Sequence, residues 1–223
     1  MAATSKRKSL HKNRLTRHKI LKNACLIADR KGIDQLTMRK LAVSLDVEAM
    51  SLYNHVTNKN DVIDGIVELV CLEFQLPDLN NHWRDALRDC AISTHQALLN
   101  HPWAASLMLS RVNISEPMLR YSDACYGCLK EAGFTYEQAD HSWNAISNHI
   151  NGFTLTNINS PVKSDDYAKA ARHYSPQVPQ DQYPHLYNMM QLIIDGTHSG
   201  VNDFEFGLDL ILDALETRLL ATQ

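Results

Sequence analysis

The stretch that decides the fold is residues 36–60, LTMRKLAVSLDVEAMSLYNHVTNKN. Thr37 directly precedes an apolar run with helical spacing, so it is a candidate N-cap of a short helix. That helix should break at Asp46, because Asp can enter the left-handed region with a local hydrogen bond. A further short helix is predicted over 48–55, with Leu52 facing inward. Two short helices joined by such a break are typical of a helix-turn-helix.

The flanking segments extend this unit on both sides. Apolar residues recur at spacings of three and four between 16 and 31, which predicts a helix with one buried face that ends at Gly32. Asn58 is followed three residues later by Asp61, which resembles a capping box for a longer helix. Pro77 should end that helix, because proline cannot continue one. We therefore expect a three-helix unit followed by a connecting helix.

The rest of the chain also follows a helical period. Only 8 Gly and 7 Pro occur in 223 residues, which disfavours a fold with many tight hairpins. The fold class predicted is all-α, with an N-terminal three-helix helix-turn-helix domain and a C-terminal helical domain for ligand binding and dimerisation. Helices are expected at 83–100, from 102, and at 115–133, 135–158, 183–195 and 203–220, with one long loop at 159–182. The expected divisions are a basic arm at 1–15, the helix-turn-helix at 16–60, the connecting helix at 61–76 and the helical domain at 77–223.

Charge divides the chain at the start of the connecting helix. Residues 1–60 carry 13 Lys and Arg against four acids, a net charge of +9, whereas residues 61–223 carry 9 against 21, a net charge of −12. The total of −3 hides this asymmetry. A basic head on an acidic body favours contact between the head and a polyanion such as DNA.

Several classes of protein are disfavoured. No apolar run is long enough to span a bilayer, and the first 20 residues lack the apolar core of a secretory signal, so a cytoplasmic protein with reduced thiols is expected. The sequence holds no Gly-rich phosphate loop and no recognisable catalytic or metal-binding motif, so neither an enzyme nor a bound cofactor or metal is expected. Cys125 and Cys128 form a lone CxxC, and its position within a predicted helix favours a structural role.

Residues 16–75 resemble the DNA-binding domain of TetR-family regulators. The similarity is carried by Leu36–Ala42, Leu45–Val47, Ser51–Val56 and Asn58–Lys59, with one departure at Asp46, where the family commonly has Gly. The resemblance implies base contacts and phosphate contacts, and the side-chain chemistry agrees, since Arg can bind guanine and Asn adenine in a bidentate manner. The residues so implied are Arg39, Ala49, Met50, Ser51, Asn54 and His55 for bases, and Thr37, Tyr53 and Lys59 for phosphates.

Segments beyond the head resemble the ligand domain of tetracycline repressors within this family. They include 83–85, 98–101, 133–134, 153–155 and 206–211. The positions that hold the drug and its magnesium ion in that domain fall here at Gln75, Cys90, Thr94, Met108, Cys125 and near Ser160. Because magnesium prefers oxygen ligands, Met108 cannot replace a metal ligand. We therefore expect a different, moderately apolar effector, in a pocket lined by Leu99, Trp103, Met108, Tyr121, Trp143, Asn144, Ser147 and Asn151.

The resemblance also implies a homodimer in which the helices at 135–158 and 203–220 pack against their partners. A stripe of Phe204, Leu208, Ile211, Leu215 and Leu219 fits such a seam, although the same spacing fits a core face within one chain. The predicted function is a repressor that a small molecule releases from a palindromic double-stranded DNA operator. Two alternatives are a thiol- or metal-responsive repressor that uses Cys90, Cys125 and Cys128, and a helical enzyme or small-molecule carrier.

Overall fold

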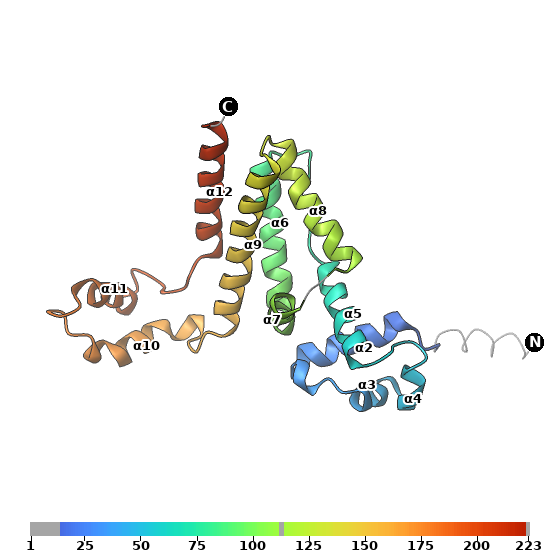
Figure 1. The fold of residues 1–223 in the computed structure, drawn as a ribbon. Helices are drawn as coiled ribbons and strands as arrows, with labels where there is room; N and C mark the ends of the chain where they lie inside the picture. Colours follow the sequence, from blue (N-terminus) through green and yellow to red (C-terminus); the bar gives the residue numbers. More distant parts are fainter. Residues whose placement is uncertain (1–13, 112–113, 222–223) are drawn as a thin grey trace, which may run out of the picture.

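The computed structural model describes residues 14–111 and 114–221, and within those ranges it contains helices and no strands. This confirms the all-α prediction. A small head lies at one end of the molecule, and α5 leads from it into a taller bundle (Figure 1). Most of the predicted basic arm lies outside the described residues. The head consists of α2 (Arg17–Lys31), a short 3-10 turn (Ile33–Gln35), α3 (Met38–Leu45) and α4 (Ala49–Leu52), followed by α5 (Lys59–Cys71).

Two head helices, α3 and α5, start directly after the predicted capping residues Thr37 and Asn58, and α2 starts directly after Thr16. The side-chain oxygens of Thr16, Thr37 and Asn58 each accept a hydrogen bond from the backbone N–H three residues further on, at 3.2, 3.2 and 3.0 Å. Each bond satisfies one of the backbone donors left without a partner in the first helical turn. Asp46 ends α3 in the left-handed conformation, with φ 55° and ψ 49°. The predicted helix-turn-helix is confirmed.

The second helix of the motif is shorter than the predicted span of 48–55. α4 ends at Leu52, after which the N–H groups of Tyr53 and His55 donate to the carbonyl oxygens of Met50 and Leu52. These bonds join residues three apart, so the chain tightens into a turn. Leu52 and Val56 are both buried and anchor this turn to the head core.

The body is a bundle around one core that is continuous with that of the head. α9 is its central helix, because it packs against α6, α7, α8 and α12. In Figure 1, α12 stands beside α9 on the side of the bundle opposite α8. No described helix is long and apolar enough to cross a membrane. The bundle helices are α6 (Trp83–Asn100), α7 (Pro102–Ser110), α8 (Glu116–Glu131), α9 (Tyr136–Ile158) and α12 (Phe204–Leu220).

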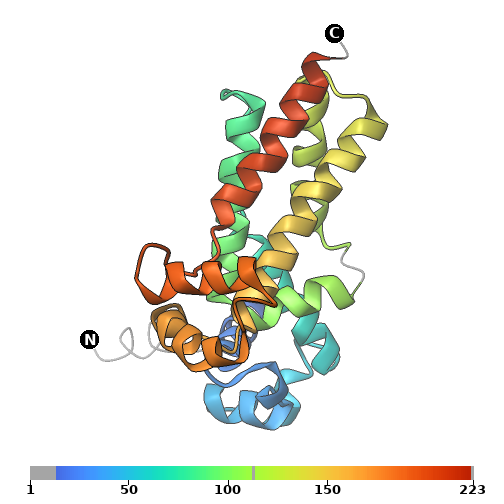
Figure 2. The same ribbon diagram turned by 90° about the vertical axis from the view of Figure 1, so that its left-hand side faces the viewer.

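The predicted long loop at 159–182 is wrong in part, because it contains the helix α10 (Tyr167–Tyr174) between two short 3-10 turns. The sequence YAKAARHY is rich in alanine, which has the highest helix propensity. α10 packs against α11 (Pro184–Ile194), and this helix pair projects sideways from the bundle below α12 (Figures 1 and 2). The pair exposes Tyr174, Leu186, Met189 and Leu192, an apolar surface that the described chain leaves uncovered.

Candidate DNA interface and ligand cavity

The outer surface of α3 and α4 presents most of the residues predicted to contact DNA. Arg39, Asn54 and Lys59 are exposed, Met50 is 75% exposed and Tyr53 is 46% exposed. Ala49, Ser51 and His55 are half-buried, and Thr37 is exposed although its hydroxyl already accepts the capping bond. The predicted residues therefore lie on two adjacent helices and the turn that follows them, where α3 and α4 form the lower end of the head in Figure 1.

The turn between α4 and α5 is held by Asp61. Its Oδ2 accepts hydrogen bonds from the Thr57 backbone N–H at 2.7 Å and from the Thr57 hydroxyl at 3.2 Å. Its Oδ1 pairs with the Arg17 guanidinium at 2.7 Å, and this hydrogen bond lowers the pKa of the Asp61 carboxyl. The arrangement ties the start of α5 to α2. Lys59 in the first turn of α5 therefore stands at a fixed helix N-terminus, which favours an anion such as phosphate.

A cavity of about 230 Å³ lies inside the bundle. Its aromatic walls come from α9 and α8 and from the segment after α5: the rings of Tyr121 and Trp143 meet edge to face at 5.6 Å between centroids, and Phe74 lies 5.2 Å from Tyr121. The cavity is lined by Phe74, Thr94, Leu98, Met108, Arg111, Met118, Tyr121, Ser122, Trp143, Ser147, Ile150 and Asn151.

The Tyr121 hydroxyl is the buried polar centre of the cavity wall. Its oxygen lies 2.7 Å from the Thr94 hydroxyl, which in turn donates to the Cys90 carbonyl at 2.9 Å. Burial raises the pKa of Tyr121 well above its usual value, so the phenol keeps its proton and donates to Thr94. The proton of Tyr121 is thus taken up by Thr94 and that of Thr94 by the Cys90 carbonyl, which leaves this part of the wall largely apolar toward a ligand.

Five of the eight predicted pocket residues line this cavity, and three do not. Met108, Tyr121, Trp143, Ser147 and Asn151 line it. Leu99, Trp103 and Asn144 are not among the residues that line it. The Trp103 indole N–H donates to Asp29 of the head at 2.6 Å, and the Asn144 amide donates back to the carbonyl oxygen of Asp140 on its own helix at 2.8 Å. These side chains are engaged elsewhere, and helical spacing alone does not reveal that.

Arg111 is a cavity residue that the sequence did not indicate. Its side chain lines the cavity and also reaches α5, where Nη1 lies 2.6 Å from Asp64 Oδ1 and Nη2 donates to Asn60 Oδ1 at 3.3 Å. Asn60 lies next to Lys59 in the chain. One side chain thus touches both the cavity and the helix that leads from the body to the head.

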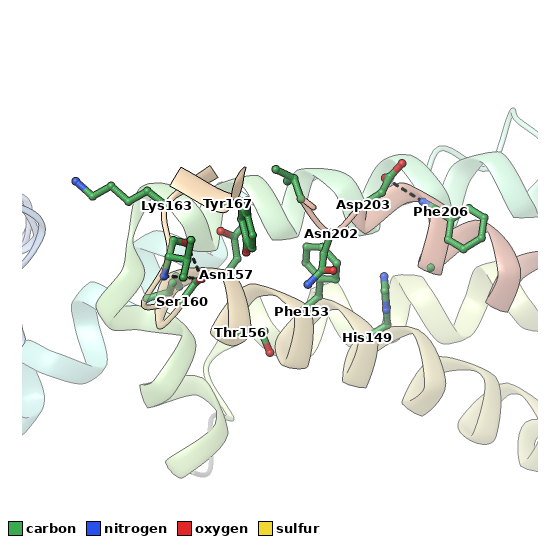
Figure 3. A pocket seen from close by; sticks show the side chains of 14 residues that line it. His149, Phe153, Thr156, Asn157, Ser160, Lys163, Tyr167, Asn202, Asp203 and Phe206 are labelled. Carbon is green, nitrogen blue, oxygen red and sulfur yellow. Dashed lines mark hydrogen bonds between the residues drawn. The ribbon is translucent and has the colours of Figure 1, made fainter. Parts of the chain in front are cut away.

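A second, larger hollow of about 750 Å³ lies outside the bundle, between the end of α9, the start of α10 and the start of α12. Figure 3 shows His149 and Phe153 of α9 and Phe206 of α12 around this hollow. His149 Nε2 donates to the Phe204 carbonyl oxygen at 2.9 Å, and Asp203 Oδ1 caps α12 by accepting from the Phe206 N–H at 3.1 Å. The hollow is therefore a pre-shaped recess on the outer face of α9 and α12.

The predicted dimer stripe on α12 needs correction. Phe204, Leu208 and Leu219 are buried inside the chain itself, and Ile211 and Leu215 pack against the same core. The apolar side chains that α12 leaves exposed are instead Phe206 at 65% and Leu210 at 57%, with Leu220 further along. The helix carries two apolar faces, and a sequence period cannot tell which one faces the core.

The thiols of the predicted alternative are buried in the core. Cys90, Cys125 and Cys128 are at most 2% exposed, and the sulfur atoms of Cys90 and Cys125 lie 3.8 Å apart. Burial raises the pKa of Cys125 and raises that of Cys128 to about 11. Because the thiolate is the reactive form, these two buried thiols are poorly suited to sense an oxidant.

Comparisons with known proteins relate both parts of the chain to transcriptional regulators. A family model described as "Tetracyclin repressor-like, C-terminal domain" matches residues 76–219. The chain is 38% identical to an HTH-type transcriptional regulator of Saccharopolyspora erythraea over 62% of this chain and 59% of that protein. It is 29% identical to the class D tetracycline repressor of Escherichia coli over 93% of this chain and 92% of that protein.

A solved structure matches the fold over nearly its whole length. The Streptomyces coelicolor TetR family protein ActR in complex with actinorhodin superposes with a TM-score of 0.73 at 23% identity, covering 94% of this chain and 98% of ActR. The shared fold thus includes both the head and the bundle.

Proposed function

Because the chain belongs to the TetR family of transcriptional regulators, we propose that it is a homodimeric repressor of a palindromic operator. It is a regulator and not an enzyme, in keeping with relatives that are named as regulators or repressors. The observation that carries the proposal is the helix-turn-helix, whose DNA-facing side chains are exposed on a head of opposite charge to the body. This function places the protein with its DNA in the cytoplasm.

The head reads bases and grips the backbone with different side chains. Arg39 and Asn54 are long enough and polar enough for bidentate contacts to guanine and adenine, and exposed Met50 suits a thymine methyl group. Lys59 contacts a phosphate at the start of α5, where helix-terminal amides add to its charge. The full proposed set is Arg39, Ala49, Met50, Ser51, Asn54 and His55 for bases, with Thr37, Tyr53 and Lys59 for the backbone.

Two copies associate through the outer faces of α9 and α12. Exposed Phe206 and Leu210 supply the apolar centre of that interface, and the recess beside Phe206 receives side chains of the partner. The projecting α10–α11 pair adds further apolar surface on the same side of the bundle (Figure 1). A two-fold dimer sets the two α4 helices roughly 34–36 Å apart, one turn of DNA, which requires a palindromic site.

The effector binds in the inner cavity between α6, α8 and α9. Aromatic walls at Tyr121 and Trp143, with Met108 beside them, suit a flat and mostly apolar molecule. Arg111 supplies a cation at the wall, so an acidic or carbonyl oxygen on the effector fits there. A tetracycline–magnesium complex is a poor fit, because Met108 and the buried thiols of Cys90 and Cys125 offer no oxygen ligand.

Arg111 gives the cavity a direct connection to the head. In the structure its guanidinium holds Asp64 and Asn60 on α5, so an effector that draws Arg111 into the cavity releases that hold. The start of α5, with Lys59, then shifts relative to the body. The dimer then has two conformations, and in one of them the spacing of the two heads does not fit the operator. An effector that binds this conformation more tightly increases its population and so releases the DNA.

A ligand screen tests this proposal directly. Compounds that raise the melting temperature by mass action are then added to the protein–operator complex. A binder that quenches Trp143 fluorescence and releases the DNA supports the proposal. Cavity binding should weaken in Trp143→Ala and persist in Trp103→Phe, since only Trp143 lines the cavity. Binders that never alter operator affinity would contradict it.

A further inference from the structure

Three potential metal ligands meet where the head touches the body. Cys25 and Asp29 lie one turn apart on α2, and His101 lies at the corner between α6 and α7. The Cys25 sulfur is 3.8 Å from His101 Nδ1 and 3.7 Å from Asp29 Oδ2, and Nδ1 is 2.8 Å from Asp29 Oδ1. One donor atom of each residue lies within 4.8 Å of the other two. The three side chains converge on one point although His101 is 76 residues from Cys25.

Two neighbours orient these donors in the way seen around bound metals. Glu73 Oε1 lies 3.2 Å from His101 Nε2 and accepts a hydrogen bond from it, while Nδ1 on the other side of the ring faces Asp29 Oδ1 and the Cys25 sulfur. The Trp103 indole donates to Asp29 Oδ1 at 2.6 Å. A histidine whose far nitrogen donates to a carboxylate is the usual second-shell arrangement of a metal ligand.

The donor set and its spacing match zinc. One thiolate, one imidazole and one carboxylate are the ligand types that Zn²⁺ accepts, whereas Mg²⁺ and Ca²⁺ prefer oxygen alone. Tetrahedral bonds of about 2.0–2.3 Å require ligand atoms about 3.3–3.6 Å apart. The separation of 3.8 Å between the Cys25 sulfur and His101 Nδ1 already lies close to this range, and the distance from Nδ1 to Asp29 Oδ1 needs to open by about 0.5 Å. The His101 side chain is 13% exposed and that of Asp29 24%, so an ion can enter from solvent.

We propose that Cys25, Asp29 and His101 bind a Zn²⁺ ion at the joint between head and body. On binding, the Cys25 thiol loses its proton to solvent as the sulfur–zinc bond forms, and the thiolate and carboxylate balance the charge of the ion. Three protein ligands leave the fourth position to water. The ion links α2 of the head to the α6–α7 corner of the body, so it fixes the angle between them. This site is independent of the effector cavity and of whether the chain is a repressor.

Titration of the full-length, chelator-treated protein with Co²⁺ tests the site, because a thiolate–Co²⁺ bond gives a near-ultraviolet charge-transfer band that zinc abolishes when it displaces the cobalt. The wild type should show one equivalent of this band per chain. Cys25→Ser should lose the band, and His101→Gln should weaken binding by tenfold or more. Cys128→Ala, which removes a buried thiol elsewhere, and Asp34→Asn, which removes an exposed head carboxylate, should bind as the wild type does.

A thermal readout covers variants whose folding is altered. Zinc at a hundredfold excess over its Kd should raise the melting temperature of the wild type by about 5–10 °C and leave that of folded Cys25→Ser unchanged, with circular dichroism confirming the fold. The absence of a thiolate–Co²⁺ band in the wild type would overturn the proposal. Persistence of the band in Cys25→Ser would overturn it as well, since another thiol would then hold the ion.

Discussion

Replacing Arg39 with alanine should change which sequences the protein prefers, whereas replacing Lys59 should weaken binding to all sequences alike. Arg39 is exposed on α3, and its side chain makes no hydrogen bond or ion pair with any other described residue. Lys59 is exposed in the first turn of α5. Because both are surface side chains, neither substitution should alter stability by more than about 0.5 kcal/mol. Any change in affinity then reports a lost contact with DNA.

The two losses differ in size and in salt dependence. A bidentate arginine–guanine contact contributes about 1–3 kcal/mol of discrimination, and a two-fold dimer has two of them. The loss for Arg39→Ala on the preferred operator is therefore about 2–6 kcal/mol, or about 30-fold to about 20,000-fold at 1.4 kcal/mol per decade. Lys59→Ala removes two phosphate contacts per dimer, which should reduce the slope of log K against log salt by about 1.8.

Fluorescence anisotropy with the operator and its single-base variants, at several salt concentrations, measures both quantities. Arg39→Lys is the matched control for charge, and it should keep most of the salt slope while losing the base preference. Lys130→Ala, in the last turn of α8 at the end farthest from the head (Figure 1), controls for a general loss of positive charge and should leave both quantities unchanged. Equal losses of specificity from Arg39→Ala and Lys59→Ala would refute the division of roles.

Three further predictions concern stability. Asp46→Ala should lower the free energy of unfolding by about 1 kcal/mol in denaturant titration, because alanine enters the left-handed region at φ 55° less readily than Asp does. Asp46→Gly should not lower it, since glycine adopts this conformation without a steric cost. Gly65→Ala should lower the melting temperature by about 2–4 °C, since a Cβ there would lie 2.7 Å from a Leu21 methyl carbon. Gly127→Ala should raise the melting temperature, because a Cβ there has open space around it and alanine has a higher helix propensity than glycine. The hydrogen bond from Arg88 lowers the pKa of Asp209 in the folded protein. This contact therefore stabilises the fold fully above the pKa of Asp in the unfolded chain, about 3.9. The stabilisation is lost as the pH falls through the lower pKa of Asp209 in the folded protein. Arg88→Met should therefore flatten the fall in stability below about pH 5, as followed by thermal unfolding, and an unchanged pH profile would contradict the assignment.

Local signals predicted the head well. Thr37 and Asn58 carry their capping information in the residue type itself, and Asp46 marks a chain break within a few residues. The motif could therefore be located before any tertiary contact was known. The length of α4 was overpredicted, because the turn after Leu52 depends on burial of Val56 against the other head helices.

Contacts between distant segments were not predictable in the same way. The helical period of α12 shows an apolar face at Leu208, but only packing against α6 and α9 reveals that this face is the core and that Phe206 remains exposed. Arg111 and Asp64 lie 47 residues apart, and no spacing rule relates them. The cluster at His101 has the same origin, since the side chains of α2 meet it only in the folded chain.

The most direct test of the central claim is selection of binding sites from a random double-stranded DNA library by the full-length protein. We predict enrichment of a palindrome whose half-sites are about 10–10.5 base pairs apart, bound by a dimer with nanomolar affinity. Arg39→Ala should lose preference at one position in each half-site. Enrichment of no sequence by the folded protein, or of a site without two-fold symmetry, would contradict the claim.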